Sequence, residues 1–303
     1  MSDLYNEIKT TKDIPEEDYL IGGSPTCAGC PAEIGLKMAL KALGKNTIVV
    51  NASGCMTLLC NYPYTPLKVP WIHSAIENAA ATASGVAHAL KILKKDATVI
   101  CYAGDGATYD IGIGSLSGMA ARGDPVIYIC YNNQSYANTG NQWDTATPFL
   151  ASTKTTPLGK QSRGNLTPTK NMVKIMGAHG IYSATASPAF PLDYMNKLRK
   201  AQAMKAPAYI EYLQPCVPGW DFEEGKGIKV AKLATESGFW PLYEIEGNRV
   251  TINYKPAQIK SVKEFLQMQG RFRHLTDYDI NVIQGLVNAD WKELLEAESC
   301  KKI

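Results

Sequence analysis

Apolar positions divide residues 31–214 into alternating helical and β-rich segments. Helical spacing of apolar residues predicts helices, and short apolar runs predict strands. The helices fall at residues 31–43, 71–93, 111–121, 170–176 and 192–203, and the strands at residues 47–51, 97–103, 125–131, 182–186 and 209–213. The strands are apolar almost throughout, which is typical of a parallel sheet that helices cover on both faces. The pattern therefore predicts an α/β fold with a doubly wound, mostly parallel sheet, whose ligands bind beyond the carboxyl ends of the strands.

The alternation is interrupted at residues 132–169 and ends after residue 214. The first of these segments is rich in Asn, Thr, Gly and Pro, and a loop of this length in a compact domain is usually functional. The tail predicts a hairpin and two amphipathic helices, at residues 242–254, 259–269 and 278–298. We therefore expect an α/β domain at residues 1–214 and a C-terminal extension at residues 215–303. The extension packs either on a partner subunit or against the same core.

Composition excludes several classes of protein. The chain has 303 residues, of which 45% are hydrophobic and 19% are charged, and this suits one large core with or without an extension. A net charge of +3 is too small to indicate nucleic acid or a membrane surface as a partner. No stretch approaches the roughly 20 apolar residues that span a bilayer, and residues 1–14 lack the apolar run of a signal peptide. We expect a cytoplasmic protein that binds neither nucleic acid nor a membrane.

Four of the eight cysteines are placed where they can meet. Without a signal peptide, clustered thiols favour metal binding or redox chemistry over disulfides. Cys27 and Cys30 form a C-x-x-C motif before the first helix, Cys55 follows the first strand, and Cys216 follows the last strand. Four thiolates suit a [4Fe–4S] cluster. A structural zinc site and a redox-active dithiol are the alternative interpretations.

The other four cysteines carry weaker signals. Cys101 and Cys130 lie inside apolar strands, where a free cysteine behaves as a small hydrophobic residue. Cys300 lies in a polar tail, and Cys60 is ambiguous because it follows Cys55 so closely. We therefore leave these four thiols out of the predicted metal site.

Polar residues also follow two neighbouring strands. Gly104-Asp105-Gly106 comes directly after the strand at 97–103 and precedes a helix, and Asn132-Asn133 ends the next strand. Glycines allow phosphates to approach the backbone closely, a helix N-terminus favours anions, and carboxylate and amide oxygens are hard ligands for Mg²⁺. Gly-Asp-Gly alone more often marks a tight turn, but the two elements together predict a Mg²⁺–diphosphate site.

This arrangement resembles the thiamine diphosphate motif of transketolase-like and decarboxylase enzymes. The resemblance implies that Asp105, Asn133 and the backbone carbonyl of Ser135 are Mg²⁺ ligands. It also implies that the segment from Tyr136 to Gly140 closes over the diphosphate and the thiazolium. The cofactor contacts that it implies are Gly54, Gly104, Asp105, Gly106, Asn133, Tyr136, Ala137 and Thr139, with Asn138 and Asn141 in catalytic roles.

Together the two signatures resemble those of the β subunit of pyruvate:ferredoxin oxidoreductase and its relatives. The similar segments occur in order between about residues 15 and 246. They are CAGC at Cys27, ASGC at Ala52, VPWIHSAIENAAATASG at Val69, AGDGATYDIGI at Ala103, YANTG at Tyr136, TTPLGK at Thr155 and PCVPGW at Pro215. A redox centre makes mechanistic sense beside a thiamine cofactor and a structural zinc does not, so we favour the cluster over zinc. The resemblance implies that Cys27, Cys30, Cys55 and Cys216 hold one [4Fe–4S] cluster.

The resemblance also implies the reaction and the partners. Thiamine diphosphate supports oxidative decarboxylation of a small 2-oxoacid, coenzyme A takes the acyl group, and electrons pass singly through the cluster to ferredoxin. A pyrimidine-binding α subunit supplies the activating glutamate, and a ferredoxin-like subunit carries two further clusters. The chain should therefore be inactive alone.

One residue departs from the pyruvate pattern. An aliphatic residue typically follows YANTG in that branch, whereas Asn141 stands here. An amide can donate hydrogen bonds to a second carboxylate, and an unpaired buried polar group costs about 1–3 kcal/mol. Oxalate, oxidised to carbon dioxide without coenzyme A, is therefore the alternative substrate, since oxalate oxidoreductases belong to the same superfamily. A non-redox thiamine diphosphate enzyme with structural zinc and a non-catalytic metal-binding scaffold subunit are the alternatives of other classes.

Overall fold

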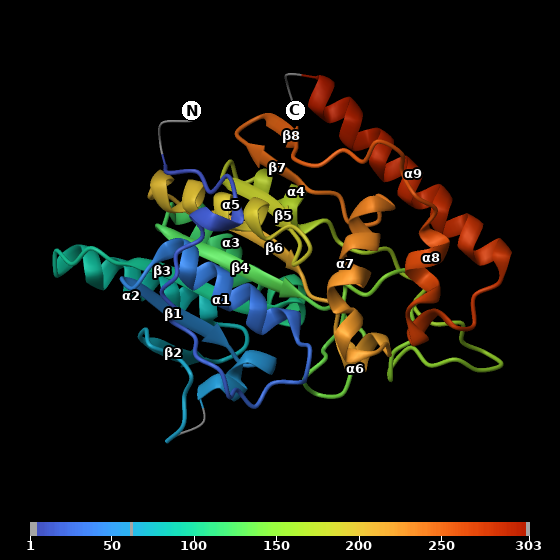
Figure 1. Cartoon of the computed structure of the whole chain (residues 1–303), viewed down its shortest axis with the longest axis horizontal. Coiled ribbons are helices and arrows are strands. Elements are labelled where there is room, and N and C mark those ends of the chain that lie inside the picture. The colour runs from blue at the N-terminus through green and yellow to red at the C-terminus, as the bar shows by residue number, and fades with distance from the viewer. Residues whose placement is uncertain (1–4, 61–62, 301–303) are drawn as a thin grey trace.

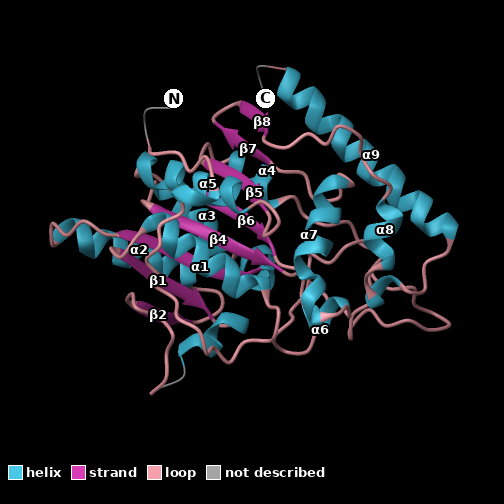
Figure 2. Ribbon diagram, in the orientation of Figure 1, coloured by secondary structure: helices cyan, strands magenta, loops and turns pink. Residues whose placement is uncertain are grey.

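The computed structural model describes residues 5–60 and 63–300, and it is organised around one eight-stranded sheet (Figure 1, Figure 2). The strand order is β2-β1-β3-β4-β6-β5-β7-β8. The strands are β1 (Thr47–Ala52), β2 (Trp71–Ser74), β3 (Thr98–Gly104), β4 (Val126–Asn132), β5 (Tyr182–Ala186), β6 (Ala208–Leu213), β7 (Tyr243–Glu246) and β8 (Arg249–Ile252). The pairs from β2 to β5 are parallel, and β7 and β8 are antiparallel. The predicted doubly wound, mostly parallel α/β fold is confirmed.

Helices cover both faces of the sheet, because successive residues of a strand point to opposite faces. The helices are α1 (Pro31–Leu43), α2 (Ala79–Ile92), α3 (Ile113–Arg122), α4 (Met172–Gly177), α5 (Pro191–Met204), α6 (Val217–Trp220), α7 (Gly227–Glu236), α8 (Val262–Gln267) and α9 (Asp277–Ser299). Along β3, Ile100 and Tyr102 pack with α1 and α5, whereas Cys101 and Ala103 pack with α2, α3 and α4. Continuous apolar sequence in the strands thus serves two separate cores.

The predicted helix at residues 71–93 is wrong at its start. Residues Trp71–Ser74 form the edge strand β2, which pairs in parallel with β1 from Val49 to Ala52, and α2 begins only at Ala79. A short edge strand has no long apolar run to reveal it, and the Ala-rich sequence that follows extends the helical pattern backwards. Backbone pairing with β1 therefore decided the conformation of these residues.

The tail forms the predicted hairpin and helices, and it also enlarges the main sheet. β7 pairs with β5 at Ser183↔Ile245, and the turn to β8 contains Gly247 with a φ of +57°. Helices α6 to α9 bury a third apolar cluster that includes Trp220 and Phe265. In Figure 1, α6, α7 and α8 lie beyond the carboxyl ends of the central strands. The boundary between residues 214 and 215 remains a prediction.

No helix in the described part of the chain combines the length and the apolar character that crossing a membrane requires.

Candidate functional site

The predicted Mg²⁺ ligands converge at the carboxyl ends of β3 and β4. Asp105 is buried directly after β3, where its Oδ2 accepts a hydrogen bond from the backbone N–H of Ser135 at 2.9 Å. Oδ1 of Asn133 accepts from the hydroxyl of Ser135 at 3.2 Å. One serine therefore contacts both predicted ligands, and their oxygens lie in the same small volume. The parallel sheet brings them together because β3 and β4 are neighbours.

A second buried carboxyl group, Asp144, accompanies Asp105. Burial raises the pKa of Asp144 to about 7. Burial and the charge of Asp144 raise the pKa of Asp105 well above its ordinary value. Oδ2 of Asp144 has no hydrogen-bond partner in the described chain. Two buried carboxyl groups with an unsatisfied oxygen fit a divalent cation, which would compensate their charge.

The loop that the sequence predicts to close over the cofactor is folded back on itself. The N–H of Tyr136 donates to the carbonyl of Gln142 at 2.9 Å, and the N–H of Asn141 donates to the carbonyl of Tyr136 at 2.9 Å. Asn138 and Thr139 are exposed at its tip, and Ala137 is partly buried. The tip is therefore accessible to a ligand or to another protein.

The glycines of the site are required by neighbouring tyrosines. A Cβ on Gly106 would lie within 2.7 Å of three ring atoms of Tyr136, whose hydroxyl donates to the carbonyl of Gly106 at 3.2 Å. A Cβ on Gly54 would lie 2.7 Å from the hydroxyl oxygen of Tyr131, and one on Gly104 would lie 3.2 Å from the same ring. Close packing under the site thus explains these positions, whether or not the glycines also touch a cofactor.

The four predicted cluster cysteines collect at the same edge of the sheet. Cys30 and Cys216 precede the first residues of α1 and α6, and Cys55 begins the turn after β1. The side-chain Nε2 of Gln214 lies 3.6 Å from Sγ of Cys30. A hollow of about 400 Å³ lies beside Cys27 and Cys30. The C-x-x-C loop therefore packs against the segment that carries Cys216.

Burial and mutual repulsion disfavour the thiolates in the metal-free chain. Burial raises the pKa of Cys55 above its ordinary value, and the charges of Cys216 and Cys30 add to this rise. Burial likewise raises the pKa of Cys216 to about 12. Among residues 5–60 and 63–300, no three His, Cys, Asp or Glu side chains are close enough to hold a metal ion. The iron–sulfur and Mg²⁺ ligands therefore remain predictions, supported by donor chemistry and by location.

Asn141 contacts the segment that carries Cys216. Its backbone has a φ of +70°, a region that favours Asn over other non-glycine residues. Its Nδ2 donates to the carbonyl of Gly219 at 3.2 Å. A Cβ on Gly219 would lie 2.9 Å from Oδ1 of Asn141 and 3.1 Å from Sγ of Cys216. The amide that the sequence analysis assigned to substrate is therefore engaged by the protein itself.

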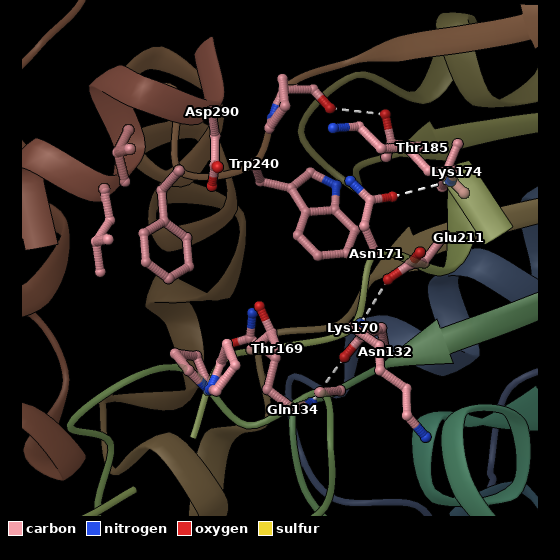
Figure 3. Close-up of a pocket in the computed structure, with 18 of the residues that line it drawn as sticks. Asn132, Gln134, Thr169, Lys170, Asn171, Lys174, Thr185, Glu211, Trp240 and Asp290 are labelled. Carbon is pink, nitrogen blue, oxygen red and sulfur yellow. Dashed lines mark hydrogen bonds between the residues drawn. The ribbon is translucent and has the colours of Figure 1, made fainter. Parts of the chain in front are cut away.

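A separate cavity of about 390 Å³ opens behind the site, between the sheet and α9. Figure 3 shows Asn132, Gln134 and Glu211 on its wall, with Trp240 and Asp290 across it. Nδ2 of Asn132 donates to Oε1 of Glu211 at 2.6 Å, so the buried carboxyl group already has a partner. Side chains alternate in direction along this segment. Asn133 therefore points towards Asp105, while Asn132 and Gln134 point towards this cavity.

Sequence reasoning missed Asp144, Trp220 and Arg271. Nε1 of Trp220 donates to the carbonyl of Asn133 at 2.7 Å, which fixes the loop after β4. Arg271 stacks on Trp220 with Cζ 3.8 Å from the ring centroid. Asp144 lies in the long irregular loop, so the unusual length of that loop was the one available signal.

Comparisons with known proteins point to one family of enzymes. Residues 52–212 match the thiamine pyrophosphate enzyme, C-terminal TPP binding domain. Pyruvate synthase subunit PorB of Methanothermobacter thermautotrophicus is 50% identical over 284 residues, which cover 93% of this chain and 99% of that protein. Ketoisovalerate oxidoreductase subunit VorB of Pyrococcus abyssi is 38% identical over 298 residues, which cover 95% and 96%.

A solved structure shares the fold. A chain of the 2-oxoglutarate:ferredoxin oxidoreductase from Magnetococcus marinus superposes with a TM-score of 0.57 at 21% identity, covering 94% of this chain and 99% of that one. The domain match and the two subunit relatives extend over most of the chain. The chain therefore belongs to the β subunits of the 2-oxoacid:ferredoxin oxidoreductases, a family of thiamine-diphosphate-dependent oxidoreductases.

Proposed function

We propose that this subunit binds thiamine diphosphate through Mg²⁺ and carries one [4Fe–4S] cluster that passes single electrons towards ferredoxin. The observation that carries the proposal is the shared location of two sets of groups. Asp105 and Asn133 meet at Ser135, and four cysteines collect at the same edge of the sheet. A redox centre at that edge lies where electrons from a bound substrate would leave the cofactor.

The residues of the chain have distinct tasks in this proposal. Asp105, Asn133 and the carbonyl of Ser135 would hold Mg²⁺, and through it the diphosphate, while Asp144 adds negative charge beside the ion. Gly106 lets Tyr136 lie against the turn, so that the loop through Asn138 can cover the cofactor. When bound, thiamine diphosphate supplies the carbanion and the electron sink that decarboxylation of a 2-oxoacid requires.

Cys27, Cys30, Cys55 and Cys216 would hold the cluster. Metal binding would reverse the raised pKa values of Cys55 and Cys216, because a coordinating thiol loses its proton. Four thiolates also satisfy zinc. A structural zinc has no task beside a thiamine cofactor, whereas a cluster can accept the electrons.

We propose pyruvate as the substrate, with coenzyme A as the acyl acceptor. Support comes from the pyruvate synthase relative at 50% identity over nearly its whole length. The amide of Asn141 supports pyruvate as well, because one of its two N–H donors already bonds to the carbonyl of Gly219 and holds the side chain against the protein. Oxalate oxidation without coenzyme A is the alternative, which requires the second N–H of this amide to donate to a second carboxylate.

The remaining parts of the proposal concern assembly. We propose that residues 215–303 pack on partner subunits in a cytoplasmic complex, and that a pyrimidine-binding α subunit and a ferredoxin-like two-cluster subunit complete the enzyme. Exposure of Asn138 and Thr139 at the loop tip supports a partner there, because a cofactor contact needs a covered surface.

The test is an anaerobic assay of the purified complex with a low-potential dye as electron acceptor. Pyruvate, 2-oxoisovalerate and oxalate are supplied in turn, with and without coenzyme A, and iron, acid-labile sulfide, zinc and thiamine diphosphate are measured on the same sample. We expect dye reduction with pyruvate and coenzyme A, together with iron and sulfide. Oxalate-driven reduction without coenzyme A would establish the alternative substrate, and zinc without sulfide would overturn the cluster.

A further inference from the structure

A buried guanidinium lies between the two halves of the proposed site. Arg271 belongs to the short turn Gly270–Phe272 after α8, and only 5% of its surface is exposed. Its Cζ lies 3.8 Å from the ring centroid of Trp220. Its Nη2 donates to Oε1 of Gln134 at 2.6 Å, and its Nε donates to Oε1 of Gln269 at 2.9 Å. The side chain thus reaches from the C-terminal helices to the loop after β4.

Trp220 connects this guanidinium to both metal-binding segments. Its backbone N–H donates to the carbonyl of Cys216 at 2.8 Å, and its Nε1 donates to the carbonyl of Asn133 at 2.7 Å. Arg271 therefore stacks on a residue whose backbone bonds to Cys216, a predicted cluster ligand, and whose ring bonds to Asn133, a predicted Mg²⁺ ligand.

Arg271 has no carboxylate partner in the described part of the chain. Its two side-chain acceptors are neutral amides, whereas the nearby surface residue Arg273 pairs with Asp221 at 2.8 Å. Burial lowers the pKa of Arg271 well below its ordinary value, but an arginine side chain keeps its proton inside proteins at neutral pH. A buried cation without a counter-anion is strongly unfavourable.

The proposed site supplies three acidic groups near Arg271, which are Cys216, Asp105 and Asp144. Burial raises the pKa of each of them in the metal-free chain, and they become anions when the metals bind. Bound Mg²⁺ would compensate the two carboxylates only in part, because it would share its charge with the diphosphate. A [4Fe–4S] cluster on four thiolates is net negative, and it gains a further negative charge on reduction. Trp220, on which the guanidinium stacks, bonds through its backbone to the residue that carries the Cys216 thiol, so the cluster is the anion to which the structure links Arg271.

We propose that Arg271 is the buried counter-charge of the [4Fe–4S] cluster and raises the reduction potential of that cluster. This inference rests on the cluster of the proposed function. Reduction adds one electron to the cluster, and a nearby fixed positive charge stabilises the more negative, reduced form. The cluster would accordingly accept an electron from the cofactor more readily than it would beside a neutral residue.

Four variants of the complete, anaerobically purified complex test this. Arg271→Gln removes the charge, and Gln134→Glu cancels it by placing a carboxylate on the guanidinium without changing the size of any side chain. The Nε2 of Gln134 donates no hydrogen bond within the described residues, so this exchange costs no existing contact. Arg271→Lys keeps a positive charge, and Arg273→Gln removes a surface charge two residues away. Redox titration followed by electron paramagnetic resonance measures each cluster.

We expect Arg271→Gln and Gln134→Glu to lower the midpoint potential of one cluster, while Arg271→Lys and Arg273→Gln stay near the wild-type value. A tenfold fall in the ratio of reduced to oxidised cluster at a fixed potential equals about 59 mV for one electron. Unchanged potentials at full iron and sulfide content would overturn the role of Arg271 and leave the proposed function standing. If the complex with Arg271→Gln does not assemble, the midpoint potential measured for Gln134→Glu decides whether Arg271 has this role. Wild-type complex without a third cluster would refute the proposed function itself.

Discussion

Gly106→Ala should damage cofactor binding through one defined collision. The added Cβ would lie within 2.7 Å of three ring atoms of Tyr136. The backbone of Tyr136 is held on both sides, by its bond to the carbonyl of Gln142 and by the bond that it accepts from Asn141. The ring can therefore escape only by rotating its side chain, which carries its hydroxyl away from the carbonyl of Gly106.

The size of the effect follows from these contacts. Forcing an extra methyl group into a packed site costs about 1–3 kcal/mol. The lost hydrogen bond from Tyr136 accounts for about 1 kcal/mol of this cost. If the bound state bears about 1–3 kcal/mol of this cost, the dissociation constant for thiamine diphosphate rises by about 5- to 150-fold. Iron and sulfide content should not change, because the atoms nearest to the added Cβ belong to Tyr136 and not to a cluster cysteine.

The assay is a titration of the cofactor-depleted complex with thiamine diphosphate at saturating Mg²⁺. Gly114→Ala is the matched control, because that helix position has nothing within 4 Å of the new Cβ. Alanine there should leave binding unchanged and stabilise α3 by roughly 0.5–1 kcal/mol.

A double-mutant cycle with Tyr136→Ala separates the collision from other effects. Without the aromatic ring, the exchange at Gly106 should cost almost nothing, so the two substitutions should be strongly non-additive. Wild-type affinity in Gly106→Ala, or additive costs in the cycle, would refute the reasoning.

Three further predictions concern the metals and the tail. Cys216→Ser should reduce iron and acid-labile sulfide while thiamine diphosphate remains bound, whereas the exposed Cys300→Ser should not; equal iron content in both would exclude Cys216 as a ligand. Asp105→Asn should weaken cofactor retention at low Mg²⁺ far more than at high Mg²⁺, measured on the desalted complex, and a loss independent of Mg²⁺ would contradict its role as a ligand. Asp279→Asn should destabilise the protein by about 1–2 kcal/mol at neutral pH, because Asp279 accepts from Thr276 at the start of α9 and pairs with Arg163 at 2.7 Å. Hydrogen bonds from Thr276 lower the pKa of Asp279. The stabilisation by Asp279 is therefore present above a pH of about 4 and is lost as the pH falls through the lower pKa of the folded protein. An equal difference in melting temperature between wild type and Asp279→Asn at pH 7 and at pH 2.5 would contradict this.

The tail illustrates how far local pattern reaches. Its hairpin and its long helix were predicted, because the turn at Gly247 and the amphipathic spacing of residues 278–298 are local signals. The pairing of the hairpin with β5 was not predictable. The same apolar residues would be buried whether the tail formed an independent extension or packed against the main core. The pairing between Ser183 and Ile245 is a long-range choice.

The sequence by itself determined the α/β class and the parallel sheet, since apolar runs buried on two faces leave few other architectures. It also placed Asp105, Asn133 and the cysteines at one edge, because parallel strands end on the same side. Only the tertiary structure brought Arg271 onto Gln134, 137 residues away, and set Asp144 beside Asp105. These contacts join irregular segments whose positions depend on the packing of distant elements, and periodicity carries no information about such packing.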